Sequence, residues 1–90
     1  MNKTAIESLS MDLLRVALGY HRGSTKMAER FLEEALKRSS EVDKAEIKPY
    51  FVRVLNRIPN ALSEVNLEKR AEDALMYSII CKNYARKFLG

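Results

Sequence analysis

His21 is the only histidine of the chain and the first side chain whose type suggests chemistry. An imidazole titrates near neutral pH, so it can serve as an acid, a base or a phosphate acceptor. The run 19–23, Gly-Tyr-His-Arg-Gly, places it at the end of a predicted helix, next to a turn. A histidine there is also stabilised by the helix dipole, and this structural role is the more common one. We therefore predict no catalytic residue and keep an activity centred on His21 as a minor alternative.

Two family resemblances pass through this histidine. The run 21–24, His-Arg-Gly-Ser, is similar to the phosphorylated histidine of histidine-phosphotransfer domains, which are four-helix bundles. That family has a lysine and a glycine one helical turn later, whereas here the glycine comes earlier and position 24 is Ser. Arg15 and His21 resemble the arginine–histidine pair of HEPN-type ribonucleases, which has a similar gap, but the residues after Arg15 are apolar here. The resemblances imply phosphotransfer or ribonuclease-like activity at His21.

The other reactive side chains indicate structure rather than catalysis. Cys81 is the single cysteine, and its place on an apolar helix face predicts a small buried side chain. The acidic pairs 33–34 and 72–73 are adjacent on predicted helices, where neighbouring side chains diverge by about 100°. The sequence contains no Glu-x-x-His pair and no glycine-rich phosphate loop. We therefore expect neither a metal nor another cofactor.

The composition suits a small globular protein. The chain has 90 residues, of which 47% are hydrophobic and 31% charged, so we predict one domain spanning 1–90. No apolar run approaches the ~20 residues that cross a bilayer, and the start, Met1 to Glu7, lacks the apolar segment of a secretory signal. The single cysteine agrees with a reducing compartment. We expect a cytoplasmic protein without a membrane partner.

The net charge of +4 is unevenly placed. Residues 1–46 are neutral overall, so residues 47–90 carry the whole excess. A basic surface with interleaved aromatic side chains can bind RNA or single-stranded DNA, and Tyr77 and Tyr84 accompany the bases of the last helix. This gives an alternative function, although basic residues more often form a solvated helix surface. The residues concerned are Lys48, Arg53, Arg57, Lys82, Arg86 and Lys87.

Apolar residues at helical spacing predict two helices in the first half. The first follows a capping box at residues 4–7, Thr-Ala-Ile-Glu, and Gly23 is its predicted end. The second begins at Ser24 or Thr25 and ends at residues 39–40. Whether these two helices are separate or form one rod bent at the glycines stays open. Asp12 is predicted on the polar side of the first helix, and Arg38 is predicted to pair with Glu34.

The third helix is complicated by two prolines. The apolar period from Ile47 to Ile58 runs across Pro49, so either a helix opens near residue 48, or a helix from residue 44 is bent at Pro49. We favour the bent helix. Pro59 is expected to end it, because the residue before a proline is pushed away from helical geometry. A short turn over residues 61–65 is then expected to cover the end of the bundle with Leu62 and Val65.

The fourth helix, residues 67–89 with Asn66 as its cap, organises the predicted fold. Its centre carries a seam of small residues that lets neighbouring helices approach closely, and Leu75, Tyr77, Tyr84 and Leu89 are expected to wrap the helices on either side. Since the connections are short, we predict an all-α fold, an antiparallel up-and-down bundle of four helices with this seam buried. The seam consists of Leu67, Ala71, Ala74, Ser78, Cys81, Ala85 and Phe88.

Apolar residues outside the predicted core suggest an association surface. Met76 and Ile80 lie opposite the seam, and Met11 and Leu18 lie near the polar side of the first helix. Exposed apolar patches mark association sites, and a symmetric homodimer is the commonest result. We therefore predict a small non-enzymatic protein–protein interaction module, either a homo-oligomer or an accessory subunit of a larger complex, which binds itself or another protein through these four residues.

Overall fold

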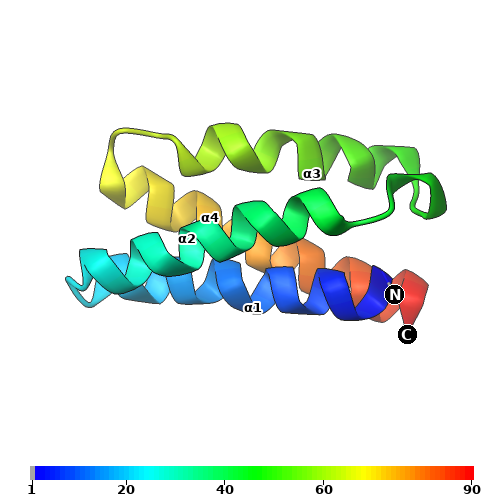
Figure 1. The fold of residues 1–90 in the computed structure, drawn as a ribbon, viewed down its shortest axis with the longest axis horizontal. Coiled ribbons are helices and arrows are strands. Elements are labelled where there is room, and N and C mark those ends of the chain that lie inside the picture. The colour runs from blue at the N-terminus through cyan, green and yellow to red at the C-terminus, as the bar shows by residue number, and fades with distance from the viewer. Residues whose placement is uncertain (1) are drawn as a thin grey trace.

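The computed structural model describes residues 2–90, which form four α-helices in an antiparallel bundle (Figure 1). The helices are α1 (Asn2–His21), α2 (Thr25–Glu41), α3 (Pro49–Leu62) and α4 (Leu67–Tyr84). A 3₁₀ turn, η1 (Lys44–Glu46), precedes α3, and a π-helical turn, η2 (Ala85–Leu89), continues α4. Helix α1 packs against α2 and α4, and α3 closes the ring, within 36 × 20 × 19 Å. The predicted fold class is confirmed.

Small residues of α4 and of the start of η2 are buried at the centre of the bundle: Ala74, Ser78, Cys81 and Ala85. On α1, Ser10 faces Ser78, and each hydroxyl donates a hydrogen bond of 2.8 Å to the other residue's carbonyl oxygen. These bonds satisfy both hydroxyls at a point where α1 and α4 approach closely. The centre of the predicted seam is therefore confirmed. Its ends are not, because Leu67 and Phe88 are both exposed.

The turn between α1 and α2 depends on two glycines. Gly23 has φ +78°, its N–H donates to the carbonyl of Tyr20, and the N–H of Ser24 donates to the carbonyl of Gly19. This pair of bonds is a Schellman cap, which favours glycine at its left-handed position. Gly19 lies against α2, where an added Cβ atom would be 2.8 Å from the Cβ of Ala28. The two helices are therefore separate, and Gly23 ends α1 as predicted.

Helix α1 begins before the predicted capping box, so Thr4 lies inside the helix rather than at its cap. Asn2 fixes the start of α1 to the α2–α3 connection: its Nδ2 donates to the carbonyl of Asp43 at 3.0 Å, and the N–H of Asp43 donates to its Oδ1 at 2.9 Å. The Asp43 carboxylate also accepts from the N–H of Ala45 at 3.1 Å. Asp43 therefore caps only the η1 turn and does not begin a longer helix.

The favoured prediction for Pro49 and the prediction for Pro59 are both wrong, and the alternative of a helix that opens near residue 48 is the one observed. Pro49 is at the first turn of α3 and does not bend a longer helix, because the N–H that it lacks would have no helical partner there. Pro59 lies inside α3, which continues to Leu62. Leu62 is buried, so burial of the last turn favours continuation across the proline. Val65 is 88% exposed and does not cover the end of the bundle.

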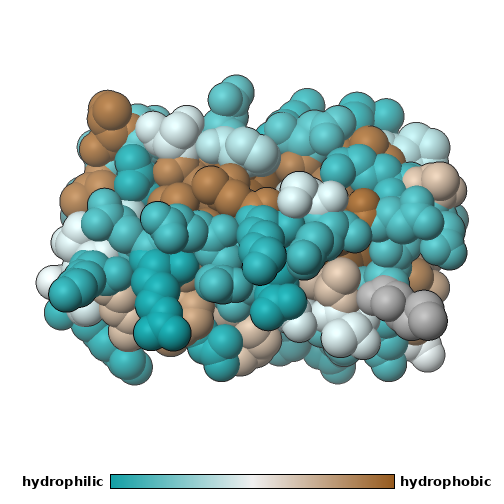
Figure 2. Space-filling view, in the orientation of Figure 1, coloured by the Kyte–Doolittle hydropathy of each residue, from teal (hydrophilic) through white to brown (hydrophobic). Residues whose placement is uncertain are grey.

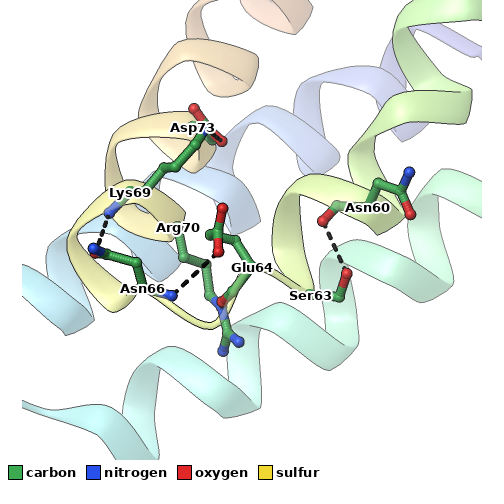
Figure 3. A network of polar contacts seen from close by, with 7 residues as sticks. All are labelled: Asn60, Ser63, Glu64, Asn66, Lys69, Arg70 and Asp73. Carbon is green, nitrogen blue, oxygen red and sulfur yellow. Dashed lines mark hydrogen bonds and ion pairs between the residues drawn. The ribbon is translucent and has the colours of Figure 1, made fainter.

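Polar contacts hold the connection between α3 and α4 (Figure 3). The Asn66 side chain accepts from the N–H of Lys69 at 3.1 Å, which confirms Asn66 as the cap of α4. Arg70 Nε donates to the carbonyl of Glu64 at 2.8 Å, and its Nη1 donates to the Tyr20 hydroxyl at 2.9 Å. Arg70 therefore ties this connection to the end of α1.

The face shown in Figure 2 is mostly polar, with apolar atoms along the line between α2 and α3. These two neighbouring helices pack less closely than α1 does with α2 or α4. Over residues 2–90, no helix combines the length and hydropathy that a membrane-spanning segment needs.

Candidate functional site: an apolar groove between α1 and α4

An apolar groove of about 410 Å³ runs between the outward sides of α1 and α4. Its floor includes Ser10 and Ser78, whose mutual hydrogen bonds hold the two helices close together. Because these floor residues are small, the larger side chains beside them rise as walls. Those walls are apolar: Met11 and Leu14 from α1, and Leu75 and Ile79 from α4.

Three of the four wall residues are large side chains left open to solvent. Met11 is 45% exposed, Leu75 44% and Ile79 51%. Single exposed hydrophobic residues are ordinary, whereas several on one surface mark a binding site. Charged side chains border one end of the groove: Glu7 from α1, Lys82 from the end of α4 and Arg86 from η2. We refer to this surface, with Met11, Leu14, Leu75 and Ile79 as its walls, as the groove.

The apolar surface continues past Leu75 toward the other end of α4. There Leu18 of α1 and Ala71 of α4 line a second hollow of about 290 Å³, which Leu75 shares. Glu72 borders this end. The groove and its extension therefore end in basic residues of α4 on one side and in an acidic residue of α4 on the other.

Two of the four predicted interface residues line the groove or its extension, and two do not. Met11 and Leu18 line the groove and its extension. Met76 is 44% exposed but does not line the groove, and Ile80 is half-buried and packs against the core. That these four residues bind a partner stays a prediction.

Leu14 and Ile79 line the groove without having been predicted from the sequence, and Leu75, which was expected to pack onto a neighbouring helix, is exposed. The available signal was their spacing. Leu75 and Ile79 are four residues apart, so they lie on one face of α4 beside the seam. Ile80 lies on the opposite flank of that seam. Ile80 packs against the core, whereas α1 meets α4 through two serines and leaves Leu75 and Ile79 exposed.

The structure places two of the six predicted nucleic-acid-binding bases at the groove and another two at Phe88. Lys82 and Arg86 border the groove on the α1 side of α4. Lys48 and Lys87 instead lie over Phe88, with their Nζ atoms 4.8 and 5.4 Å from its ring centroid. The remaining two, Arg53 and Arg57, are exposed on α3.

Tyr84 is not available for stacking on a nucleic-acid base. It is buried, its ring stacks on Phe51 with centroids 4.0 Å apart, and its hydroxyl accepts from the N–H of Lys48 at 3.0 Å. It therefore anchors the start of α3 to the end of α4. Tyr77 is half-buried and packs against the core.

His21 is exposed and borders the groove extension beside Ala71 and Glu72. Arg15 lies toward α2, with its guanidinium 5.3 Å from the ring centroid of Phe31. The arginine–histidine pair that the ribonuclease resemblance requires is therefore not brought together. Within residues 2–90, no cluster of three or more His, Cys, Asp or Glu side chains has the arrangement of a metal site.

The two buried reactive side chains, Asp12 and Cys81, have structural rather than catalytic surroundings. Asp12 is buried rather than on the polar face, because Arg38 Nε of α2 donates to its Oδ2 at 2.8 Å. Arg38 thus pairs with Asp12, and no ion pair with Glu34 forms within residues 2–90. Cys81 is buried as predicted, and burial raises the pKa of its thiol to about 12. A thiol that stays protonated at neutral pH is a poor nucleophile.

Comparison with protein-family models, with curated proteins and with solved structures finds no match for this chain. Any function must therefore be argued from the geometry of the groove and its surroundings.

Proposed function

We propose that this protein is a non-enzymatic interaction module that binds a protein partner through the groove. The observation that carries this proposal is the exposure of Met11, Leu75 and Ile79 on one continuous surface. Removing apolar surface from water stabilises a complex by about 25 cal/mol per Å². A partner that covers these side chains is therefore bound more tightly.

The shape and chemistry of the groove suit a helical partner. It lies between two helices, its walls are apolar, and its charged residues, Glu7, Lys82 and Arg86, stand at one end. An amphipathic helix laid along such a groove buries its apolar side and keeps its charged residues at the rim. A small polar substrate would find few groups to orient it, because most of the groove surface is apolar.

Site-specific photocrosslinking tests the proposal. Ile79 is replaced by a photoreactive phenylalanine analogue in the protein expressed in its own organism, and Met76 is replaced in a matched control. Met76 has similar exposure on the same helix but does not line the groove. We expect a protein adduct from position 79 that is absent from position 76 and is lost when Met11→Asp places a charge in the groove.

Equal labelling at positions 76 and 79 would contradict a specific groove interface. Absence of any protein adduct at position 79 would overturn the proposed function.

A second candidate function, nucleic-acid binding, is favoured by the surroundings of Phe88. This ring is 39% exposed, and the Nζ atoms of Lys48 and Lys87 are 4.8 and 5.4 Å from its centroid. It also contacts the exposed ring of Tyr50, with centroids 6.5 Å apart. Aromatic rings beside cations can bind single-stranded nucleic acid by stacking and by neutralising phosphates.

Fluorescence anisotropy with labelled single-stranded RNA and DNA tests this second function. We expect binding that weakens steeply with added salt, because each phosphate contact releases counterions. Phe88→Ala should weaken binding, and Lys87→Ala should both weaken binding and reduce its salt dependence, because one phosphate contact is lost. Absence of binding at low salt would exclude this function.

A further inference from the structure

The face of α4 that is turned toward α1 carries a symmetric pattern of charge. Its six exposed residues are Glu68, Glu72, Leu75, Ile79, Lys82 and Arg86. Counted from Tyr77, these residues form three pairs at two, five and nine residues on either side: Leu75 with Ile79, Glu72 with Lys82, and Glu68 with Arg86. In both charged pairs the acid lies toward the start of the helix and the base toward its end.

None of these four charged residues forms an ion pair with another side chain among residues 2–90. Their charges are therefore available to a partner. A surface that places acids and bases at equal distances from an apolar centre is complementary to itself when one copy is turned around. Two copies of this α4 face meet that condition.

We propose that the protein bound in the groove is a second copy of this chain. The two α4 helices are antiparallel and related by a twofold axis that lies at the level of Tyr77 along the helix, on the exposed side opposite the Tyr77 side chain. This inference rests on the proposed function and specifies its partner. In this arrangement Leu75 of each copy packs against Ile79 of the other. Glu72 lies opposite Lys82 of the other copy, and Glu68 lies opposite Arg86.

Helix geometry places the two members of each pair at the same distance from the twofold axis, so all three pairs can form in one antiparallel alignment. At a rise of 1.5 Å per residue, nine residues correspond to about 13.5 Å along the helix on either side of the axis. Glu68 and Arg86 are therefore equally far from the axis, as are Glu72 and Lys82. Arg86 belongs to η2, yet it lines the same groove as Leu75 and Ile79, so the π-helical turn does not remove it from this face.

Helix α1 adds apolar surface at the centre of the same interface. The hydrogen bonds between Ser10 and Ser78 place these two residues at the same level of the bundle. Met11, the next residue on α1, therefore lies near the level of Tyr77 and of the twofold axis. A parallel arrangement of two α4 helices would instead place acids against acids and bases against bases, which is unfavourable.

Charge reversal with mixing tests both the partner and the register. We measure the dimer dissociation constant by sedimentation equilibrium for Glu72→Lys, for Lys82→Glu, for an equimolar mixture of the two, and for the double variant. Each single variant should weaken the homodimer about tenfold or more, because each change makes two symmetry-related pairs repulsive. In the mixture, one copy carries two bases where the other carries two acids, so a heterodimer should form with at least wild-type affinity. The double variant should form a homodimer again.

Two matched controls carry the same changes of charge on other helices: Glu33→Lys on α2 and Arg57→Glu on α3, both at exposed positions. They should leave the dissociation constant of the dimer within about twofold of wild type, because neither substituted residue belongs to the face of α4 that forms the three pairs. Thermal unfolding followed by circular dichroism should show that all variants keep the fold, because the substituted side chains are exposed.

The outcomes separate this inference from the proposed function. A wild type that stays monomeric at high micromolar concentration would overturn the second copy as partner, while a different protein crosslinked at position 79 would leave the proposed function standing. A dimer whose two single variants do not pair on mixing would overturn the antiparallel register. Recovery of dimer in both the mixture and the double variant would support the proposal.

Discussion

Gly19 has no room for a side chain where α1 meets α2. An added Cβ atom would lie 2.8 Å from both the Cβ and the backbone nitrogen of Ala28. Gly19→Ala should therefore destabilise the protein by about 1–3 kcal/mol through overpacking, even though alanine favours helix by about 1 kcal/mol in an unhindered position. Urea unfolding followed by circular dichroism measures the change.

The control for this prediction removes the opposing side chain on α2 while keeping the alanine at position 19. In the double variant Gly19→Ala, Ala28→Gly, the Cβ on α2 is absent but its backbone nitrogen remains, so stability should recover only in part. An undiminished stability of Gly19→Ala alone would show that the two helices can separate freely at this contact.

The pKa of Cys81 predicts a pH dependence of stability. Burial raises this pKa from 9.0 to about 12, so the folded thiol stays protonated while the unfolded thiol ionises. The unfolded state then binds fewer protons between these values, so stability is complete below pH 9 and falls as pH rises toward 12. The slope from this group is at most about 1.4 kcal/mol per pH unit.

Comparison with Cys81→Ala isolates this contribution, because other groups also titrate in alkaline solution. The free energy of unfolding should fall less steeply with pH in the variant than in the wild type. Identical slopes would mean that the thiol ionises equally in the folded and unfolded states.

At the scale of the helix, Pro59 is retained inside α3 at a cost. A proline in a helix interior removes one backbone hydrogen bond and crowds the carbonyl four residues earlier, here that of Leu55. Pro59→Ala restores this bond, and the gain is reduced by the greater freedom of the unfolded chain. We expect a net gain of about 1–2 kcal/mol in chemical unfolding. A loss of stability would show instead that the proline shapes α3 to fit the bundle.

Local signals in the sequence predicted most of the fold but misplaced several boundaries. Gly23 and Asn66 act as the predicted stop and cap because their effects depend only on neighbouring backbone atoms. The effect of Pro59 depends on tertiary packing, since burial of Leu62 favours a continued helix. Asp12 appeared to belong to the polar face because its partner, Arg38, lies on another helix.

The candidate site was predictable only in part for the same reason. Helical spacing identified Met11 and Leu18 as apolar residues off the core face. On α4, residues on both flanks of the small seam have similar spacing, and only the packed structure shows that Ile80 is covered while Leu75 and Ile79 are not. The sequence alone does not specify how closely each neighbouring helix approaches.

At the scale of the whole molecule, the bundle presents one face suited to assembly. Small serines bring α1 and α4 together and leave larger apolar residues at the surface. The charges on α4 then favour a particular orientation of a second copy. In the proposed dimer, packing within the monomer and association between copies would depend on the same pair of helices.

Self-association through the groove is tested most directly by sedimentation equilibrium of the wild type, Ile79→Asp and Met76→Asp over the micromolar range. The chain mass is 10.4 kDa, and we expect the wild type and Met76→Asp to approach twice that mass as concentration rises, while Ile79→Asp stays at the monomer mass. A wild type that remains at 10.4 kDa, or a dimer lost in Met76→Asp but kept in Ile79→Asp, would contradict the assignment of the groove as the self-association surface.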